Sequence, residues 1–129
     1  MYLVTGGAGF IGSHLVERLW RDGQRVRLLD NFSTGTRENL AFAEGEGRLE
    51  IIAGDITDPA VVAGAARGVG VIFHQAAMRS VPRSVDDPLG ANHNNVTGTL
   101  NVLVAAQRAG VRRVVYASSS SVYGDRPEL

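Results

Sequence analysis

Glycines near the start of the chain have the clearest chemical meaning. Residues 5–12 read Thr-Gly-Gly-Ala-Gly-Phe-Ile-Gly, after an apolar run and before residues with helical spacing. Two overlapping spacings, Gly6-x-x-Gly9-x-x-Gly12 and Gly7-x-Gly9-x-x-Gly12, match turns that bring a dinucleotide diphosphate against the backbone. The amides of residues 10–12 would open a helix without intrahelical acceptors, which suits an anion. The alternative is a plain packing turn, and the strand-turn-helix context favours the phosphate site.

A carboxylate at the end of the next apolar run complements this turn. Asp30 is placed to accept two hydrogen bonds from an adenosine ribose, and its charge would repel a 2′-phosphate. The pattern therefore favours NAD over NADP. Arg37 could neutralise a phosphate, which leaves NADP as the alternative.

Polar residues also follow the other apolar runs, at Asp55-Ile56, at residues 74–79 and at residues 118–121. Carboxyl ends of parallel strands share one edge of a sheet, so we expect one crevice there. Asp55 has two equal interpretations, a contact to an adenine amine or a turn-stabilising acid. His74 is expected to be a satisfied core residue. A serine hydroxyl after the last run would hydrogen-bond a substrate oxygen, and spacing alone does not say which serine.

Apolar runs and helix signals alternate along the chain. Strands are expected at 2–5, 25–30, 49–53, 71–74 and 113–117, and helices at about 11–22, 37–43, 58–67 and 88–110. Mostly solid apolar runs predict a parallel sheet covered on both faces. The expected fold is an α/β, Rossmann-like doubly wound sheet with strand order 3-2-1-4-5, in a single domain over residues 1–129.

Composition excludes several function classes. The chain has 129 residues with 13 acidic and 13 basic residues, and every basic residue is arginine. Zero net charge provides no electrostatic footprint for nucleic acid or anionic lipid. No apolar run is long enough for a membrane span, and no signal peptide is recognised, so cytoplasmic placement is expected. There is no cysteine, and the three histidines have no ligand spacing, so no metal is expected.

Taken together, the motifs resemble those of the extended short-chain dehydrogenase/reductases, and most closely the NAD-dependent epimerase/dehydratase group that acts on nucleotide sugars. Within that group the chain looks like the 4-epimerases of UDP-hexoses, and residues 74–84 are similar to the branch acting on UDP-N-acetylglucosamine. The matching segments are Thr-Gly-Gly-x-Gly-Phe-Ile-Gly at 5–12, Asp30-Asn31, Gly54-Asp55-Ile56, His74-Gln75-Ala76-Ala77, Asn95-Val96-x-Gly98-Thr99-x-Asn101 and residues 118–124.

The resemblance implies a role for each matching position, with NAD as cofactor and a UDP-sugar as substrate. Ser119 would be the catalytic hydroxyl. Residues implied to bind the sugar are Ser80, Val81, Ser119 and Ser120. Residues implied to bind NAD are Gly6, Gly9, Phe10, Ile11, Gly12, Asp30, Asn31, Ser33, Thr34, Gly35, Asp55, Ile56, Ala76, Ala77, Arg79 and Asn95.

The implied reaction is epimerisation through a transient 4-keto sugar, with hydride removed from C4 and returned to its other face. The family uses a Tyr-x-x-x-Lys pair, but this chain has no lysine, and the residue four positions after Tyr123 is Pro127. We therefore expect the N-terminal part of an epimerase, truncated before the later strands and the substrate domain, that binds NAD weakly without turning over sugar.

Two features of the resemblance leave alternatives. The apolar stripes on the helix at 88–109 are expected to carry a homodimer interface, or else to be buried within the full-length domain. A non-catalytic NAD-binding module, or a dehydratase, decarboxylase or reductase of the same group, is the competing function.

Overall fold

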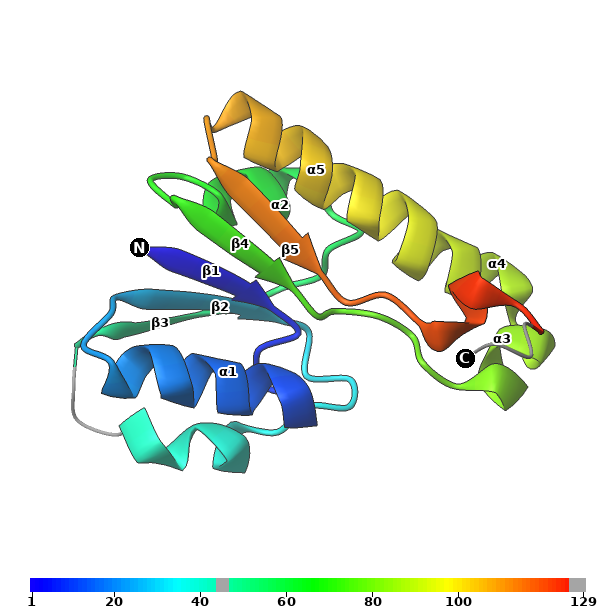
Figure 1. The fold of residues 1–129 in the computed structure, drawn as a ribbon, viewed down its shortest axis with the longest axis horizontal. Helices are drawn as coiled ribbons and strands as arrows, with labels where there is room; N and C mark the ends of the chain where they lie inside the picture. The colour runs from blue at the N-terminus through cyan, green and yellow to red at the C-terminus, as the bar shows by residue number, and fades with distance from the viewer. Residues whose placement is uncertain (44–46, 126–129) are drawn as a thin grey trace.

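A computed structural model, which describes residues 1–43 and 47–125, contains a parallel five-stranded sheet with helices on both sides (Figure 1). The strands are β1 (Tyr2–Thr5), β2 (Val26–Asp30), β3 (Leu49–Ala53), β4 (Val71–His74) and β5 (Arg113–Tyr116). Their order is β3-β2-β1-β4-β5, and every neighbouring pair is parallel. This confirms the predicted Rossmann-like topology, with strand limits shifted by one residue at β2 and β5.

The first helices begin and end at the expected signals. Helix α1 (Phe10–Arg21) ends before Gly23, whose φ of 76° is readily adopted only by glycine. Helix α2 (Pro59–Ala65) has Pro59 at its first turn, and the Asp58 side chain accepts hydrogen bonds from the amides of Ala60 and Val61. The predicted short helix after β2 is the 3₁₀ helix η1 (Arg37–Ala43).

The long helix predicted after Asp87-Pro88 is present, but its middle is π-helical. It consists of α4 (Pro88–Asn92), η2 (His93–Thr97) and α5 (Gly98–Arg108), and the backbone stays helical at both junctions. A π-helical turn inserts an extra residue into the helix and is frequent at functional sites. Two asparagines of η2 turn out to line the cleft described below.

Two short helices border the same cleft and were absent from the sequence-based prediction. Helix α3 (Val81–Asp86) begins at Ser80, whose hydroxyl accepts a hydrogen bond from the Arg83 amide at 3.3 Å. The signal for it is a serine N-cap followed by Pro82 in the first turn. The 3₁₀ helix η3 (Ser120–Tyr123) follows β5.

The sheet separates two cores because successive side chains of a strand point to opposite faces. On one face, Leu3, Leu29 and Ile72 pack with buried residues of α2 and α5. On the other face, Val4 and Leu28 pack with Val16 of α1 and with Leu40 of η1. Adjacent Leu28 and Leu29 are both fully buried, which explains why this strand reads as a solid apolar run.

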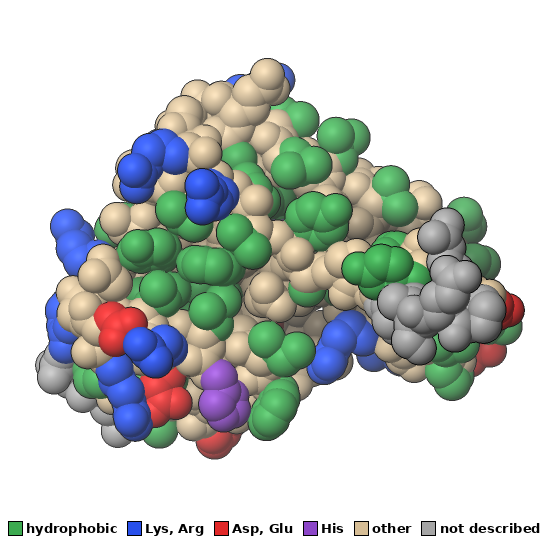
Figure 2. All heavy atoms as spheres, viewed as in Figure 1, with side chains coloured by type: hydrophobic (Ala, Val, Ile, Leu, Met, Phe, Trp, Pro, Cys, Tyr) green, Lys and Arg blue, Asp and Glu red, His purple; other side chains and the backbone are tan. Residues whose placement is uncertain are grey.

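Helices were expected to cover both faces of the sheet, but they cover the face on the side of α1 only in part. Strand register places Phe73 and Val115 beside Val4 on this face, but α1 and η1 lie over the β1–β3 half (Figure 1). Phe73 stacks on Tyr2, and Val115 remains 40% exposed. Figure 2 shows hydrophobic side chains gathered on this side of the molecule. The long helix after β4 does not cover Phe73 and Val115, because it packs with α2 on the opposite face of the sheet.

Within the described ranges, every helix is too short or too polar to cross a bilayer.

Candidate functional site

The carboxyl ends of all five strands meet at one cleft with a volume of about 960 Å³. This position is the crevice that open α/β sheets use for ligands, and the volume is of the size that holds a cofactor. The predicted single crevice is confirmed. The predicted residues among its lining are Gly6, Gly9, Phe10, Ile11, Gly12, Asp30, Asn31, Ser33, Thr34, Ile56, Ala76, Ala77, Arg79, Ser80, Asn95 and Ser119.

The glycine turn after β1 brings backbone, rather than side chains, to the cleft. Gly6 has a φ of 67°, and a Cβ there would come within 2.7 Å of the Ala76 amide nitrogen. A Cβ on Gly12 would fall on the Gly6 carbonyl oxygen. Gly7 instead packs on Leu28 and does not line the cleft. The spacing beginning at Gly6 therefore describes the ligand-facing turn.

Helix α1 presents backbone donors to this cleft. Its first intrahelical hydrogen bond runs from the Ser13 amide to the Gly9 carbonyl at 2.8 Å, and no side chain caps the helix. Residues 10–12 consequently have amides for which the described residues supply no acceptor. These donors and the positive end of the helix dipole form a site for an anionic group.

Asp30 lies beside this turn and is 8% exposed. One carboxylate oxygen accepts from the Ala8 amide at 2.9 Å, and the other accepts from the Phe32 amide at 2.8 Å. Phe32 has a φ of 55°, an unusual value for a bulky residue, so the carboxylate stabilises a strained turn. A carboxylate oxygen has two acceptor positions, so both oxygens keep capacity for ligand hydroxyls.

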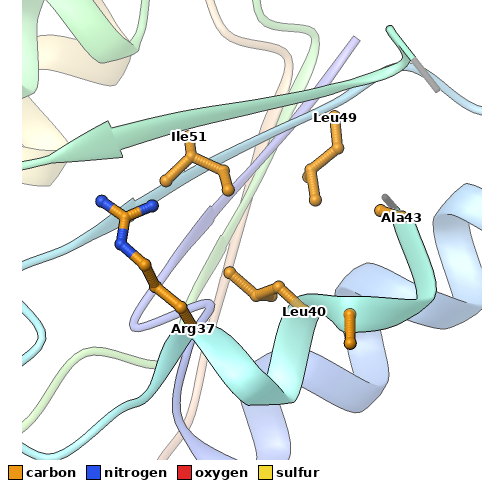
Figure 3. A pocket seen from close by; sticks show the side chains of 6 residues that line it. Arg37, Leu40, Ala43, Leu49 and Ile51 are labelled. Carbon is orange, nitrogen blue, oxygen red and sulfur yellow. The ribbon is translucent and has the colours of Figure 1, made fainter. Parts of the chain in front are cut away.

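Arg37, the residue that left NADP open, lies against a different hollow (Figure 3). Its guanidinium lies 4.8 Å from the centre of the Phe32 ring, and its side chain points towards Ile51 across a space of about 260 Å³ between η1 and β3. The lining of the main cleft includes Asp30 and does not include Arg37. This arrangement favours an unphosphorylated ribose.

The structure places Asp55 outside the lining of the cleft. Its carboxylate accepts from the Asn31 side-chain amide at 2.7 Å and from the Thr57 amide and hydroxyl, each at 2.8 Å. Burial opposes ionisation of Asp55, but these hydrogen bonds together outweigh it and lower the pKa of Asp55. Of the two interpretations that the sequence left open, these bonds match the turn-stabilising acid, while the neighbouring Ile56 does line the cleft.

Two further predicted residues do not line the cleft. Gly35 packs against the phosphate turn, where a Cβ would come within 2.6 Å of the Ala8 carbonyl carbon. Val81 opens α3 with its side chain 74% exposed, directly after the cleft-lining Ser80. In both cases the preceding residue, Thr34 or Ser80, lines the cleft, and the predicted residue does not.

The loop between β4 and α3 forms the opposite wall. The side-chain amide of Asn95 binds Met78 twice, accepting from its amide at 2.7 Å and donating to its carbonyl at 3.0 Å. Asn95 therefore fixes a stretch of irregular backbone that lines the cleft.

His74, at the end of β4, is buried and hydrogen-bonded on both ring nitrogens. Nδ1 lies 2.6 Å from the Thr5 hydroxyl, and Nε2 lies 2.9 Å from the Thr99 hydroxyl. Burial lowers the pKa of His74, so its neutral form is favoured. The expectation of a satisfied core histidine is confirmed.

The serine run after β5 reaches the same cleft, where Ser118 and Ser119 are both exposed lining residues. The Ser119 carbonyl also accepts from the Val122 amide at 3.2 Å, which begins the turn of η3. The side chain of Ser120 lies outside the described part of the structure. Among the described residues, no group of His, Asp or Glu side chains is arranged to hold a metal ion.

Sequence reasoning missed several lining residues. Some come from segments that it did not assign to the site, and Arg83 reaches the cleft because the unrecognised α3 carries it there. Recognising the Ser80 cap would have revealed that helix. Gln75, Met78 and Ser118 lie in the segments expected at the crevice, although no individual role was expected for them. The missed residues are Leu29, Gly54, Arg83, Asn94, Tyr116, Ala117 and Val122.

Comparison with known proteins identifies one family. Residues 2–129 match the NAD dependent epimerase/dehydratase family. The chain is 50% identical over 127 residues to the UDP-glucose 4-epimerase of Mycolicibacterium smegmatis, an alignment that covers 97% of this chain and 41% of that protein.

Solved structures agree with the sequence comparison. The UDP-N-acetylglucosamine 4-epimerase from Methanobrevibacter ruminantium M1, in complex with UDP-N-acetylmuramic acid, superposes with a TM-score of 0.90 at 41% identity, covering 99% of this chain and 40% of that one. A double mutant of DesIV, the dTDP-glucose 4,6-dehydratase from Streptomyces venezuelae, with NAD and DAU bound, superposes with a TM-score of 0.92 at 40% identity, covering 100% and 42%. The chain spans about two fifths of each of these three proteins.

Proposed function

Because the chain belongs to the NAD dependent epimerase/dehydratase family, we propose that it is the NAD-binding part of a nucleotide-sugar 4-epimerase. One observation carries the proposal. The unpaired amides that open α1 and the buried carboxylate of Asp30 lie on the same cleft, in the positions that suit a diphosphate and an adenosine ribose.

The residues present fit NAD. Residues 10–12 would hold the diphosphate through their amides, and Gly12, which has no Cβ, lets the start of α1 pack against the Gly6 carbonyl so that these amides reach the cleft. Asp30 would accept from the adenosine ribose, with Asn31, Ser33 and Thr34 beside it. When bound, NAD supplies a hydride acceptor and donor to a sugar carbon. Asp30 in the cleft, with Arg37 outside it, supports NAD over NADP.

The sugar would lie near the ends of β4 and β5. Ser80, which follows β4, and Ser119, which follows β5, both line the cleft. Ser119 would hydrogen-bond the C4 oxygen of a UDP-sugar and hold its proton during transfer. The identity of 50% to the UDP-glucose 4-epimerase, against 40% to the dehydratase, supports a 4-epimerase of UDP-sugars over the dehydratase alternative.

Chemistry at the C4 oxygen also needs a base. The chain contains no lysine that would lower the pKa of a catalytic tyrosine. We therefore expect residues 1–129 to bind NAD without interconverting UDP-glucose and UDP-galactose. Accumulation of UDP-galactose from UDP-glucose by the purified chain would contradict this part of the proposal.

Titration with NAD+ tests the cofactor site directly. The chain should bind NAD+ more tightly than NADP+. Gly12→Ala should weaken NAD+ binding by about tenfold or more, because its Cβ would clash with the Gly6 carbonyl oxygen and displace the amides of residues 10–12, with the loss of at least one charge-assisted hydrogen bond. Gly64→Ala is the matched control, because a Cβ there meets nothing within 4 Å and Gly64 does not line the cleft. Equal NAD+ affinity of the Gly12 and Gly64 variants would remove the phosphate site from the proposal.

The long helix offers a surface for a second copy of the chain. Val102, Ala105 and Ala106 face the core, whereas Val96, Leu100 and Leu103 are 59%, 57% and 47% exposed. The spacing of the three exposed residues places them on one outer face, as an isologous helix pair requires. We propose that this face forms the homodimer interface.

A further inference from the structure

A chain of hydrogen bonds crosses the buried side of the cleft through His74. The Thr99 hydroxyl donates its single proton to the Asn95 carbonyl, at 2.6 Å. It must therefore accept from the ring, which places the proton of His74 on Nε2. Nδ1 is then an acceptor for the Thr5 hydroxyl, which itself accepts from the Ala76 amide at 3.4 Å.

Both ends of this chain reach the same stretch of backbone. One end is the Ala76 amide, two residues after His74. The other end is Asn95, whose side chain accepts from and donates to Met78. The wall of residues 76–78 is thus held at its start by β1 and at its end by η2, and His74 connects the two attachments.

The part of the ligand that meets this wall follows from the geometry of the cleft. Asp30 fixes the adenosine side at the end of β2, and the diphosphate site lies at the end of β1. A dinucleotide that continues across the sheet must place its second nucleoside at the end of β4, where residues 76–78 form the lining.

We propose that His74 is a positioning residue that, as a neutral ring with its proton on Nε2, fixes residues 76–78 as the wall for the nicotinamide half of NAD. This inference rests on the proposed NAD-binding function. His74 does not line the cleft and is 5% exposed, so it acts through Thr5, Thr99 and Asn95.

The decisive variants are His74→Phe, which keeps a buried ring without nitrogens, and Thr99→Val, which removes only the hydroxyl. Ile72→Val is the control, because Ile72 is a fully buried residue of the same strand with no polar group. Binding of ADP and of NAD+ is measured for each. Both decisive variants should weaken NAD+ binding by about fivefold or more, the equivalent of one hydrogen bond, while ADP binding stays within about twofold of wild type.

Amide hydrogen exchange gives a second readout that needs no ligand. Exchange at Ala76 and Met78 should accelerate by about fivefold or more in His74→Phe relative to Ile72→Val, while exchange at Leu28 in the sheet stays unchanged. If His74→Phe does not fold, Thr99→Val provides both comparisons.

The possible results separate the two proposals. Equal loss of ADP and NAD+ affinity, or unchanged exchange at Ala76 and Met78, overturns the role of His74. If the wild-type chain binds neither ADP nor NAD+, the proposed function fails. Exchange at Ala76 and Met78 then still decides whether His74 fixes the wall.

Discussion

Asp30 has a structural role, and we propose a binding role for the same side chain. Its two oxygens accept from Ala8 in the phosphate turn and from Phe32 in the next turn, so the carboxylate joins both segments of the adenosine side. Asp30 also lines the cleft. A residue that orders its own site in this way is preorganised for a ligand before the ligand arrives.

Asp30→Asn tests this double role. The amide NH2 cannot accept a hydrogen bond, so one backbone amide loses its partner and the ribose loses an acceptor. NAD+ affinity should fall by about 10–100-fold, as expected for loss of a hydrogen bond to a charged group, and the preference over NADP+ should shrink. Calorimetric titration measures both, with the exposed Asp22→Asn as control. Unchanged preference in Asp30→Asn would show that another group selects the cofactor.

His74 makes stability depend on pH. Burial lowers its pKa below the ordinary value of 6.5. The unfolded chain therefore takes up a proton at a higher pH than the folded chain, so the free energy of unfolding should fall as pH drops below about 6.5, by at most about 1.4 kcal/mol per pH unit. Asp55 acts in a lower window, because its lowered pKa adds stability that is present above pH ~4 and lost only on further acidification.

Denaturant unfolding at a series of pH values between about 7 and 5 measures the histidine contribution. His74→Phe should flatten the dependence of the free energy of unfolding on pH. Ile72→Val should lower the free energy of unfolding at every pH and leave that dependence unchanged. A His74→Phe profile parallel to that of wild type would assign the slope to another group.

At the scale of elements, a cap residue decides where helix α2 begins. Asp58 accepts from the Ala60 amide at 2.8 Å and from the Val61 amide at 3.3 Å. Helix α1 is the exception, because its N-cap is Gly9 and no side chain satisfies its first amides. Among these two helices, the uncapped one is the one that opens onto the cleft.

Asp58→Ala tests the contribution of a cap. Removal of its two hydrogen bonds should lower the free energy of unfolding by about 1 kcal/mol, within the usual range for N-cap residues. Asp22→Ala is the comparison, since Asp22 forms an exposed pair with Arg18 near the end of α1 and should change stability by about 0.5 kcal/mol or less. Chemical denaturation measures both. Equal losses would indicate that the Asp58 hydrogen bonds add nothing beyond a surface ion pair.

The π-helical turn shows how an element adapts to its site. It lies where the long helix passes the cleft, and it contains Asn94 and Asn95. Thr99 donates to the carbonyl of Asn95, and the Asn95 side chain is directed to Met78. In this turn the helix has π-helical rather than α-helical backbone hydrogen bonds, and Asn95 of the turn contacts Met78 in the wall of the cleft.

At the scale of the whole molecule, the opposite sides of the long helix have different environments. Its inner side completes the core with α2, and its outer side exposes Val96, Leu100 and Leu103. An apolar stripe of this kind on an exposed helix indicates a protein contact more than a monomer surface.

Leu100→Glu should therefore shift the chain from dimer to monomer, because a charge would be buried at the centre of the proposed interface. Sedimentation velocity over a range of concentrations measures the shift. Gln24→Glu introduces the same charge at an exposed position between α1 and β2, away from the long helix, and should leave the dimer intact. A wild-type chain that stays monomeric at all concentrations would remove this interface.

The sequence predicted the strands, their order and most of the site because those features depend on local signals. Apolar runs mark the strands, glycines mark the turns, and Asp58-Pro59 marks a helix start. Polar residues that follow parallel strands must meet at one edge, so the cleft itself was predictable. The exceptions are α3, which the Ser80 cap signals, the 3₁₀ helix η3, and the π-helical turn, for which the sequence carries no local signal.

Tertiary structure alone decided which way individual side chains face. Asp55 turns to Asn31 and Thr57, Gly35 packs on Ala8, and Val81 faces outward, although each is adjacent to a cleft-lining residue. The hydrogen bonds through His74 connect β1, β4 and the long helix, which are far apart in the sequence. Periodicity and spacing report only what neighbouring residues impose on each other, whereas orientation and long-range hydrogen bonds are fixed when the packed layers select one arrangement.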